Sequence, residues 1–191
     1  MMENGVFIFK ESRYTSVPAH RFIYPEINYI YSGSCDFCIE GKTYTLNQGD
    51  MLILEPDVIH STSFKSSDDI IVSIALKDII NKSDDNGENI IFNFFAESMN
   101  KARKKNHFFI YRENDESELV SMTAQMLLYT YFGIRNEKSS ILIREYVHLL
   151  LLHLVSAACN SEMPNKSLVK EDRLIMLVLQ KLQKDTKTCN L

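Results

Sequence analysis

Short apolar runs separated by turn residues fill the first part of the chain. Gly33, Gly41 and Gly49 lie eight residues apart, and three of the four prolines precede residue 60. Evenly spaced turn signals between short apolar runs are typical of an all-β sandwich or barrel. The pattern therefore predicts a jelly roll with Glu40-Gly41 as a hairpin turn. Its eight strands are expected at about residues 5–9, 20–24, 26–32, 35–40, 42–46, 51–55, 59–65 and 70–76.

The hydrophobic period becomes helical in the proline-free stretch between Pro56 and Pro164. Apolar residues recur every three or four positions over 88–105, which predicts a helix. Four of its last five residues are basic. Cations complement the dipole at a helix C-terminus, and a nucleic-acid patch is the alternative interpretation. The apolar run at residues 107–111 predicts a short strand.

Two further helices follow this strand. Asp115 and Glu118 resemble a capping box, and Gly133 is a C-terminal stop signal. The apolar repeat of this helix consists of Leu119, Met122, Met126 and Tyr129. A serine at 139 or 140 caps a second helix that extends to Asn160, and the short connection predicts an antiparallel helix hairpin.

The helix over 139–160 is apolar around nearly its whole circumference, so it must be buried on two sides. One side can pack on the β domain. A second copy of the chain is the simplest partner for the other side, which predicts a homodimer with paired helices. A core formed within one chain is the alternative. The expected dimer contacts are Val147, Leu150, Leu151 and Leu154.

The chain divides into three parts by these patterns. Residues 1–82 are expected to form the barrel, and residues 83–160 the helical dimerisation region. Residues 161–170 are polar and include a proline, which predicts a linker. An amphipathic helix is then expected over 171–184, so 161–191 form the third part.

Composition and charge narrow the function classes. The 191 residues carry a formal net charge of −4, which argues against nucleic-acid binding through bulk charge. The N-terminus lacks a signal-peptide pattern, and no apolar run approaches the roughly 20 residues of a membrane helix. A cytoplasmic protein without a membrane partner is expected. Cys35 and Cys38 form a CxxC in a strand pattern that points them to opposite faces, so reduced, non-catalytic thiols are predicted.

Three residues in the β half carry candidate site chemistry. The stretch His20-Arg21-Phe22, followed by Glu26, resembles the first cupin motif, in which two histidines and a glutamate ligate a metal. Phe22 occupies the position of the second histidine, so the site has one metal ligand fewer than the motif.

Gly49-Asp50 leading to His60 resembles the second cupin motif. Asp57 stands where this motif usually has glycine, and Phe64 stands where asparagine is common. Imidazole and carboxylate groups could still hold a divalent metal. Contact with an effector and a purely structural role are the alternatives, and neither a metal nor another cofactor is predicted.

A wider resemblance covers the whole chain. The run EINYIYSGSCDFCIEGKTYTLNQGDMLILEPDVIHS resembles the sensory domain of AraC-family transcription regulators, and the two helices after the barrel are similar to that family's dimerisation helices. Residues 171–191 are similar to the entry into its DNA-binding region. This resemblance implies an α+β chain that contacts DNA only through a C-terminal domain missing here.

The family resemblance implies a small-molecule effector, such as a sugar or other metabolite, inside the barrel, and no enzymatic activity. Strand alternation and the two motifs predict the effector-contacting residues. They are His20, Phe22, Glu26, Asn28, Ile30, His60, Thr62 and Phe64. The alternatives are a small metal-dependent cupin enzyme, such as an isomerase or dioxygenase, and a structural dimerisation module with an empty barrel.

Overall fold

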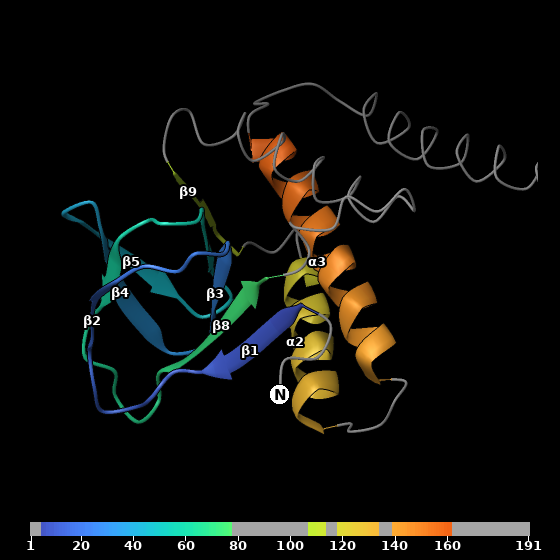
Figure 1. The fold of residues 1–191 in the computed structure, drawn as a ribbon, viewed down its shortest axis with the longest axis horizontal. Coiled ribbons are helices and arrows are strands. Elements are labelled where there is room, and N and C mark those ends of the chain that lie inside the picture. The colour runs from blue at the N-terminus through green and yellow to red at the C-terminus, as the bar shows by residue number, and fades with distance from the viewer. Residues whose placement is uncertain (1–4, 78–106, 114–117, 134–138, 162–191) are drawn as a thin grey trace, which may run out of the picture. The chain divides into compact units, whose positions relative to one another are not determined.

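The computed structural model describes residues 5–77, 107–113, 118–133 and 139–161 (Figure 1). These residues form an antiparallel β-sandwich followed by two helices, which confirms the α+β class and the jelly-roll prediction. The helices expected over 88–105 and 171–184 lie outside the described residues, as do Asp115 and nearly all of the expected linker.

Two sheets face each other in the sandwich, and all neighbouring strands are antiparallel. The five-stranded sheet has the order β1 (Val6–Lys10), β8 (Ile70–Leu76), β3 (Glu26–Ser32), β6 (Met51–Leu54) and β9 (Phe108–Tyr111). The four-stranded sheet has the order β2 (Val17–His20), β7 (His60–Thr62), β4 (Ser34–Ile39) and β5 (Lys42–Asn47). The strands β1 and β2 are therefore edge strands.

The β4–β5 hairpin turns at Glu40-Gly41, as predicted, with φ of 51° and 78°. Positive φ at both central residues is the geometry of a type I′ turn. The strand expected over 20–24 is wrong, because the sheet strand occupies 17–20 and the chain then leaves the sheet. Beyond His20, the carbonyl of Phe22 accepts a hydrogen bond from the Asp57 amide at 2.7 Å, in the loop between β6 and β7.

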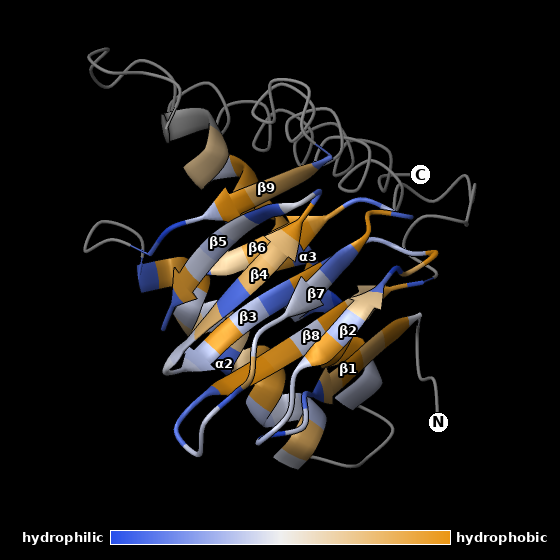
Figure 2. Ribbon diagram, turned by 90° about the vertical axis from the view of Figure 1, so that its left-hand side faces the viewer, coloured by the Kyte–Doolittle hydropathy of each residue, from blue (hydrophilic) through white to orange (hydrophobic). Residues whose placement is uncertain are grey.

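The five-stranded sheet is buried on both faces, and its strands alternate between two cores. In β3, Ile27 and Tyr29 pack with the helices, whereas Ile30 packs with the four-stranded sheet. Figure 2 shows the sandwich from the side of the four-stranded sheet, with α2 (Glu118–Gly133) and α3 (Ser139–Ser161) behind it. Consecutive residues of β3 therefore point into different cores.

The helices differ from the prediction in the faces that they bury. Four residues expected at a dimer contact are enclosed by their own chain, with exposed fractions of 0–1%: Val147, Leu150, Leu151 and Leu154. They pack in the core between the helices and the five-stranded sheet. A second copy would therefore have to meet other side chains of the helical region.

The apolar repeat predicted for α2 points outward. Leu119, Met122, Met126, Tyr129 and Phe132 are 48–67% exposed. The helix instead buries Val120, Ala124, Leu127 and Leu128. The repeat correctly identified a helix, which ends at Gly133 as expected, but it marks the exposed side of that helix.

By length and composition, the segment Ser139–Ala158 of α3 could cross a membrane, although the sequence interpretation expected no span. Part of its apolarity has a local explanation in this structure. Val147, Leu150, Leu151 and Leu154 lie in the core, and 39% of the segment is buried.

Candidate functional site

Buried polar side chains gather between the two sheets. We call this group the interior polar cluster, and it consists of Glu11, Glu26, Asn28, His60, Thr62, Lys65 and Ser73. The side chains of these residues are at most 9% exposed. They come from β3, β7 and β8 and from the segments that follow β1 and β7. Burial of so many polar groups is costly unless each finds a partner.

An ion pair occupies one end of the cluster. The Lys65 ammonium lies 3.1 Å from Oε2 of Glu11 and donates a hydrogen bond of 2.9 Å to the Thr62 hydroxyl. The Lys65 side chain is 1% exposed and that of Glu11 is 9% exposed. The backbone holds both partners in place, since the amide of Glu11 bonds to Ile71 and that of Lys65 bonds to Thr15. The two charges compensate each other inside the barrel.

Ser73 connects the ion pair to Asn28. Its hydroxyl lies 3.2 Å from Oε1 of Glu11 and 2.8 Å from Oδ1 of Asn28, and its single hydrogen serves one acceptor at a time. Asn28 Nδ2 is buried and has no acceptor at ordinary hydrogen-bond distance among the residues that the structure describes, although the Asn28 side chain lies close enough to the Glu26 carboxyl to lower its pKa. An amide donor in this state recovers little of its desolvation cost.

Glu26 and His60 face each other across the barrel. Oε2 of Glu26 lies 3.5 Å from Nε2 of His60, and this oxygen also has no hydrogen-bond partner within the described ranges. His60 Nδ1 donates to the carbonyl of Val58 at 3.1 Å, so a neutral ring presents the lone pair of Nε2 to Glu26. A proton on the carboxyl group would fit between them.

The environment favours the neutral forms of this pair. Burial, helped by the negative charge of Glu11, raises the pKa of Glu26 from 4.5 to about 7, against smaller lowering contributions from the Ser73 and Asn28 side chains. Burial also lowers the pKa of His60, and the nearby His20 ring contributes in the same direction. Near neutral pH, a large fraction of Glu26 therefore carries a proton beside an uncharged imidazole.

A row of rings runs from the cluster toward the edge strands. The rings of His20 and His60 are 4.3 Å apart, and His20 and Phe22 are 5.6 Å apart in an edge-on arrangement. Phe22 continues to Phe9 at 6.2 Å, and Phe9 to Phe7 at 5.3 Å. The row thus joins β1 of one sheet to β2 of the other, beside polar groups of the barrel interior.

The structure brings most of the predicted effector residues together. Glu26, Asn28, Ile30, His60 and Thr62 are buried between the sheets, and His20 and Phe22 are half-buried at the row of rings.

Phe64 does not belong to this group, because it is 65% exposed. The prediction extended strand alternation to residue 65, but β7 ends at Thr62. Lys65 points inward instead. Sequence reasoning missed Glu11, Lys65 and Ser73. The alternation of β8 could have identified Ser73, whereas no sequence pattern distinguishes the two charged residues from exposed ones.

The geometry does not favour a metal centre at the cupin motif positions. His20 Nδ1 and His60 Nδ1 both contact backbone carbonyls, at 2.9 and 3.1 Å, an arrangement that would leave each Nε2 to ligate a metal. Phe22, however, supplies a ring where the motif has a ligand. No group of three histidine, cysteine or acidic residues in the described part of the chain is arranged to hold a metal ion.

The Gly49-Asp50 pair of the second motif has a structural role. The Asp50 carboxylate accepts hydrogen bonds from the amides of Asn47 and Glu113, at 2.9 and 3.0 Å. It also pairs with Arg112 at 2.6 Å. These bonds fasten the β5–β6 turn to the residues after β9. The two CxxC cysteines face opposite sides of their strand as predicted, with Cys35 buried and Cys38 exposed, and both are free thiols.

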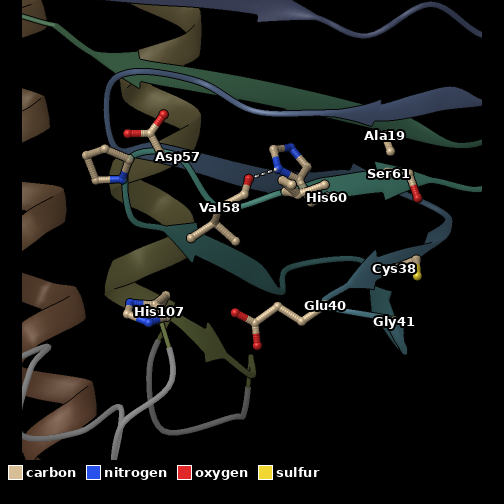
Figure 3. Close-up of a pocket in the computed structure, with 11 residues that line it drawn as sticks. Ala19, Cys38, Glu40, Gly41, Asp57, Val58, His60, Ser61 and His107 are labelled. Carbon is tan, nitrogen blue, oxygen red and sulfur yellow. Dashed lines mark hydrogen bonds between the residues drawn. The ribbon is translucent and has the colours of Figure 1, made fainter.

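The described residues form two surface hollows, and the first of them reaches His60 of the interior polar cluster. One of about 590 Å³ adjoins Val58 and the hairpin at Glu40, on the side of the four-stranded sheet to which Cys38 and Ser61 point (Figure 3). The other, of about 570 Å³, lies between the sheet and α2, where Tyr31 and Tyr129 line it. Neither contains the unpartnered atoms of Asn28 and Glu26.

Comparisons with solved structures find weak overall similarity. ToxT from Vibrio cholerae is 11% identical, with a TM-score of 0.49 over 92% of this chain and 64% of that one. The DMSP lyase DddQ from Ruegeria pomeroyi DSS-3 is 19% identical, with a TM-score of 0.34 over 40% of each chain. KdgF from Halomonas sp. is 16% identical, with a TM-score of 0.33 over 40% of this chain and 84% of that one.

The comparison with protein families is more specific. No curated protein matches the chain in sequence. Residues 4–71 match the AraC-like ligand binding domain, a segment that includes β1 to β7 and most of the interior polar cluster. This match agrees with the family resemblance found in the sequence over residues 4–71.

Proposed function

We propose that the chain is the effector-sensing and dimerising part of an AraC-type transcription regulator, and that it binds a small molecule inside the barrel. Binding would involve His20, Phe22, Glu26, Asn28 and His60. The role is regulatory and not enzymatic. DNA contacts belong to a separate region of the regulator, and the protein acts in the cytoplasm.

The buried, unpartnered atoms of Asn28 and Glu26 are the observation that carries this proposal. A buried donor or acceptor without a partner costs roughly 1–3 kcal/mol, which a ligand that bonds to it recovers. Both atoms lie on β3, within the segment that matches a ligand-binding domain. The adjacent rings of His20 and Phe22 add aromatic surface, which is typical of small-molecule sites.

The same strands can carry the signal to the helices. Asn28 and Ser73 are paired in register on β3 and β8, and they face the barrel interior. Their neighbours Ile27 and Ile74 pack in the core with α2 and α3. A ligand that moves β3 or β8 would shift this core, and it regulates only if it favours one of two arrangements.

Thermal-shift screening with sugars and other metabolites tests the effector proposal. A ligand at 100 times its Kd should increase the free energy of unfolding by about 2.7 kcal/mol, which corresponds to a rise in Tm of roughly 5–10 °C. Asn28→Leu should abolish this shift, because it removes the amide donor while keeping the side-chain volume.

Asn47→Leu is the matched control, since Asn47 is exposed on β5, and it should retain the full shift. A ligand that stabilises the Asn28→Leu protein as much as the wild type would exclude the barrel interior as its site. A screen without any stabilising ligand would favour the structural-module alternative.

We propose further that dimers form through α2, with a second copy as the partner. Leu119, Met122, Met126 and Tyr129 follow the 3-4-3 spacing of a coiled-coil seam. All four are at least 48% exposed, and large exposed apolar patches mark interaction sites. Two copies of this stripe could pair about a two-fold axis.

Sedimentation at tens of micromolar protein tests the dimer. The wild type should sediment as a dimer, and Met126→Glu with Tyr129→Glu should raise the dimer Kd at least about 100-fold, because buried unpaired carboxylates oppose association. Ile23→Glu is the control, since Ile23 is 67% exposed but far along the chain from α2. A monomeric wild type would contradict the proposal.

A further inference from the structure

The hollow between the five-stranded sheet and α2 is reachable from solvent, and the proposed function does not use it. Its volume is about 570 Å³, and its most buried lining residues are Val72 and Leu128. Three aromatic side chains that are 44–67% exposed also line it: Tyr31, Tyr129 and Phe132. A volume of roughly 300–1,000 Å³ with apolar and aromatic walls is typical of small-molecule sites.

Lys10 contributes a cation to this hollow. It lies on β1 directly opposite Val72 of β8, and directly opposite residues of an antiparallel pair share one face of the sheet. Lys10 is exposed, and no carboxylate among the described residues lies within ion-pair distance of its ammonium group. The other described residues that line the hollow are uncharged. The hollow therefore combines an apolar and aromatic surface with one uncompensated positive charge.

Helix geometry sets this hollow beside the exposed stripe of α2. Gln125, Leu128 and Phe132 line the hollow and recur every three or four positions, so they form a row along one flank of the helix. Of the stripe residues, Met126 and Tyr129 also line the hollow. A ligand in the hollow therefore contacts only the edge of the stripe.

The charge of Lys10 decides between classes of ligand. A carboxylate can accept charge-assisted hydrogen bonds from the ammonium group, whereas a cationic ligand would be repelled and a carboxamide offers only a neutral acceptor. Because Lys10 is exposed, its ammonium group keeps contact with water in such a pair, and the desolvation cost is small. The rings that line the hollow favour an aromatic body, since aromatic pairs gain more than their buried area alone provides.

We infer that this hollow binds a small aromatic carboxylate, with the carboxylate at Lys10 and the aromatic ring against Tyr31 and Phe132. The site is separate from the barrel interior. It stands or falls independently of the effector site proposed there.

Three indole probes that differ in the charge of the side group test the inference: indole-3-acetate, indole-3-acetamide and tryptamine. The chain contains no tryptophan, so indole fluorescence excited beyond the tyrosine band reports the probe alone. The fluorescence anisotropy of each probe, titrated with the full chain, gives its Kd. The Kd of indole-3-acetate should be at least about threefold lower than that of the amide, as expected for an exposed ion pair. Tryptamine should bind most weakly.

Lys10→Met should remove the preference for the anion. The Kd of indole-3-acetate should rise to that of indole-3-acetamide, whose own Kd should stay unchanged, and Lys10→Arg should keep the preference because it keeps the charge. Lys42→Met is the matched control, since Lys42 is an exposed lysine on β5 of the other sheet, and all three Kd values should stay unchanged. Phe132→Ser removes part of the aromatic wall, so it should raise all three Kd values by a similar factor.

The outcomes separate this site from the barrel. Equal Kd values for the three probes, or a Lys10→Met protein that still prefers indole-3-acetate, would show that Lys10 does not recognise the ligand. Unchanged binding to Phe132→Ser would place the ligand elsewhere, and a Kd that rises with protein concentration would assign the hollow to a second copy. Asn28→Leu should leave indole-3-acetate binding intact, and a loss of binding would move the carboxylate into the barrel. If no probe binds, the hollow site is overturned and the barrel site is unaffected.

Discussion

Replacing Lys65 with methionine should lower the free energy of unfolding by about 3–5 kcal/mol, the usual cost of breaking a buried ion pair from one side. Lys65 is 1% exposed, and its removal leaves the Glu11 carboxylate, itself 9% exposed, without a cation. The Thr62 hydroxyl also loses its lysine donor. Urea unfolding at pH 7 measures the change as a shift of the transition midpoint.

The double variant Glu11→Gln, Lys65→Met should recover most of this loss, because uncharged side chains of similar volume remove the desolvation cost of both charges. Arg21→Met is the control. The Arg21–Asp57 pair has a separation of 3.8 Å and side chains 63–65% exposed, so its loss should cost less than about 1 kcal/mol. Equal costs for Lys65→Met and Arg21→Met would contradict the assignment of a buried pair.

The second large effect is a loss of stability with rising pH that depends on Glu26. The pKa of this carboxyl is 4.5 in its ordinary state and about 7 in the folded protein. Between these values, the folded state holds a proton that the unfolded chain has released. The free energy of unfolding should therefore fall by about 1.4 kcal/mol per pH unit, or about 3 kcal/mol in total, as pH rises through this range.

Glu26→Gln removes the titrating group, so the free energy of unfolding of this variant should not show the loss of about 3 kcal/mol with rising pH. The difference between wild type and variant isolates Glu26 from His60, whose lowered pKa acts in the opposite direction and costs stability as pH falls. Glu40→Gln, at an exposed hairpin position, should keep the wild-type pH dependence. Parallel profiles for wild type and Glu26→Gln between pH 5 and pH 8 would show that Glu26 ionises normally.

Sequence patterns predicted the β-sandwich well because its rules are local. The spacing of Gly33, Gly41 and Gly49 marked the turns, and alternation along β3 placed Glu26, Asn28 and Ile30 correctly. Alternation holds only while the chain remains in a strand. It failed at Phe64 because β7 ends two residues earlier, and a three-residue strand has too few positions for a clear period.

The charged half of the cluster could not be predicted for a different reason. Glu11 and Lys65 lie outside strands, and each is buried because the other is present. A lysine or glutamate is normally exposed, so a sequence pattern gives no reason to place either inside. Their pairing depends on the closure of β1 against β8, which brings residues 54 positions apart into contact.

The helices also show a limit of sequence analysis, in this case for an apolar segment. An apolar helix such as α3 must be buried, but the sequence does not state whether its own chain or a partner buries it. Here the five-stranded sheet and α2 enclose Leu150, Leu151 and Leu154. The exposed stripe of α2, with Met126 and Tyr129, is therefore the better candidate for a partner contact.

A crystal structure of the chain with the most stabilising compound from the thermal-shift screen tests the central claim most directly. The account predicts ligand density inside the barrel, within hydrogen-bond distance of Asn28 Nδ2 and the Glu26 carboxyl and against the ring of Phe22. Density in either surface hollow, with Asn28 Nδ2 still unpartnered, would contradict the assignment of the barrel interior as the effector site.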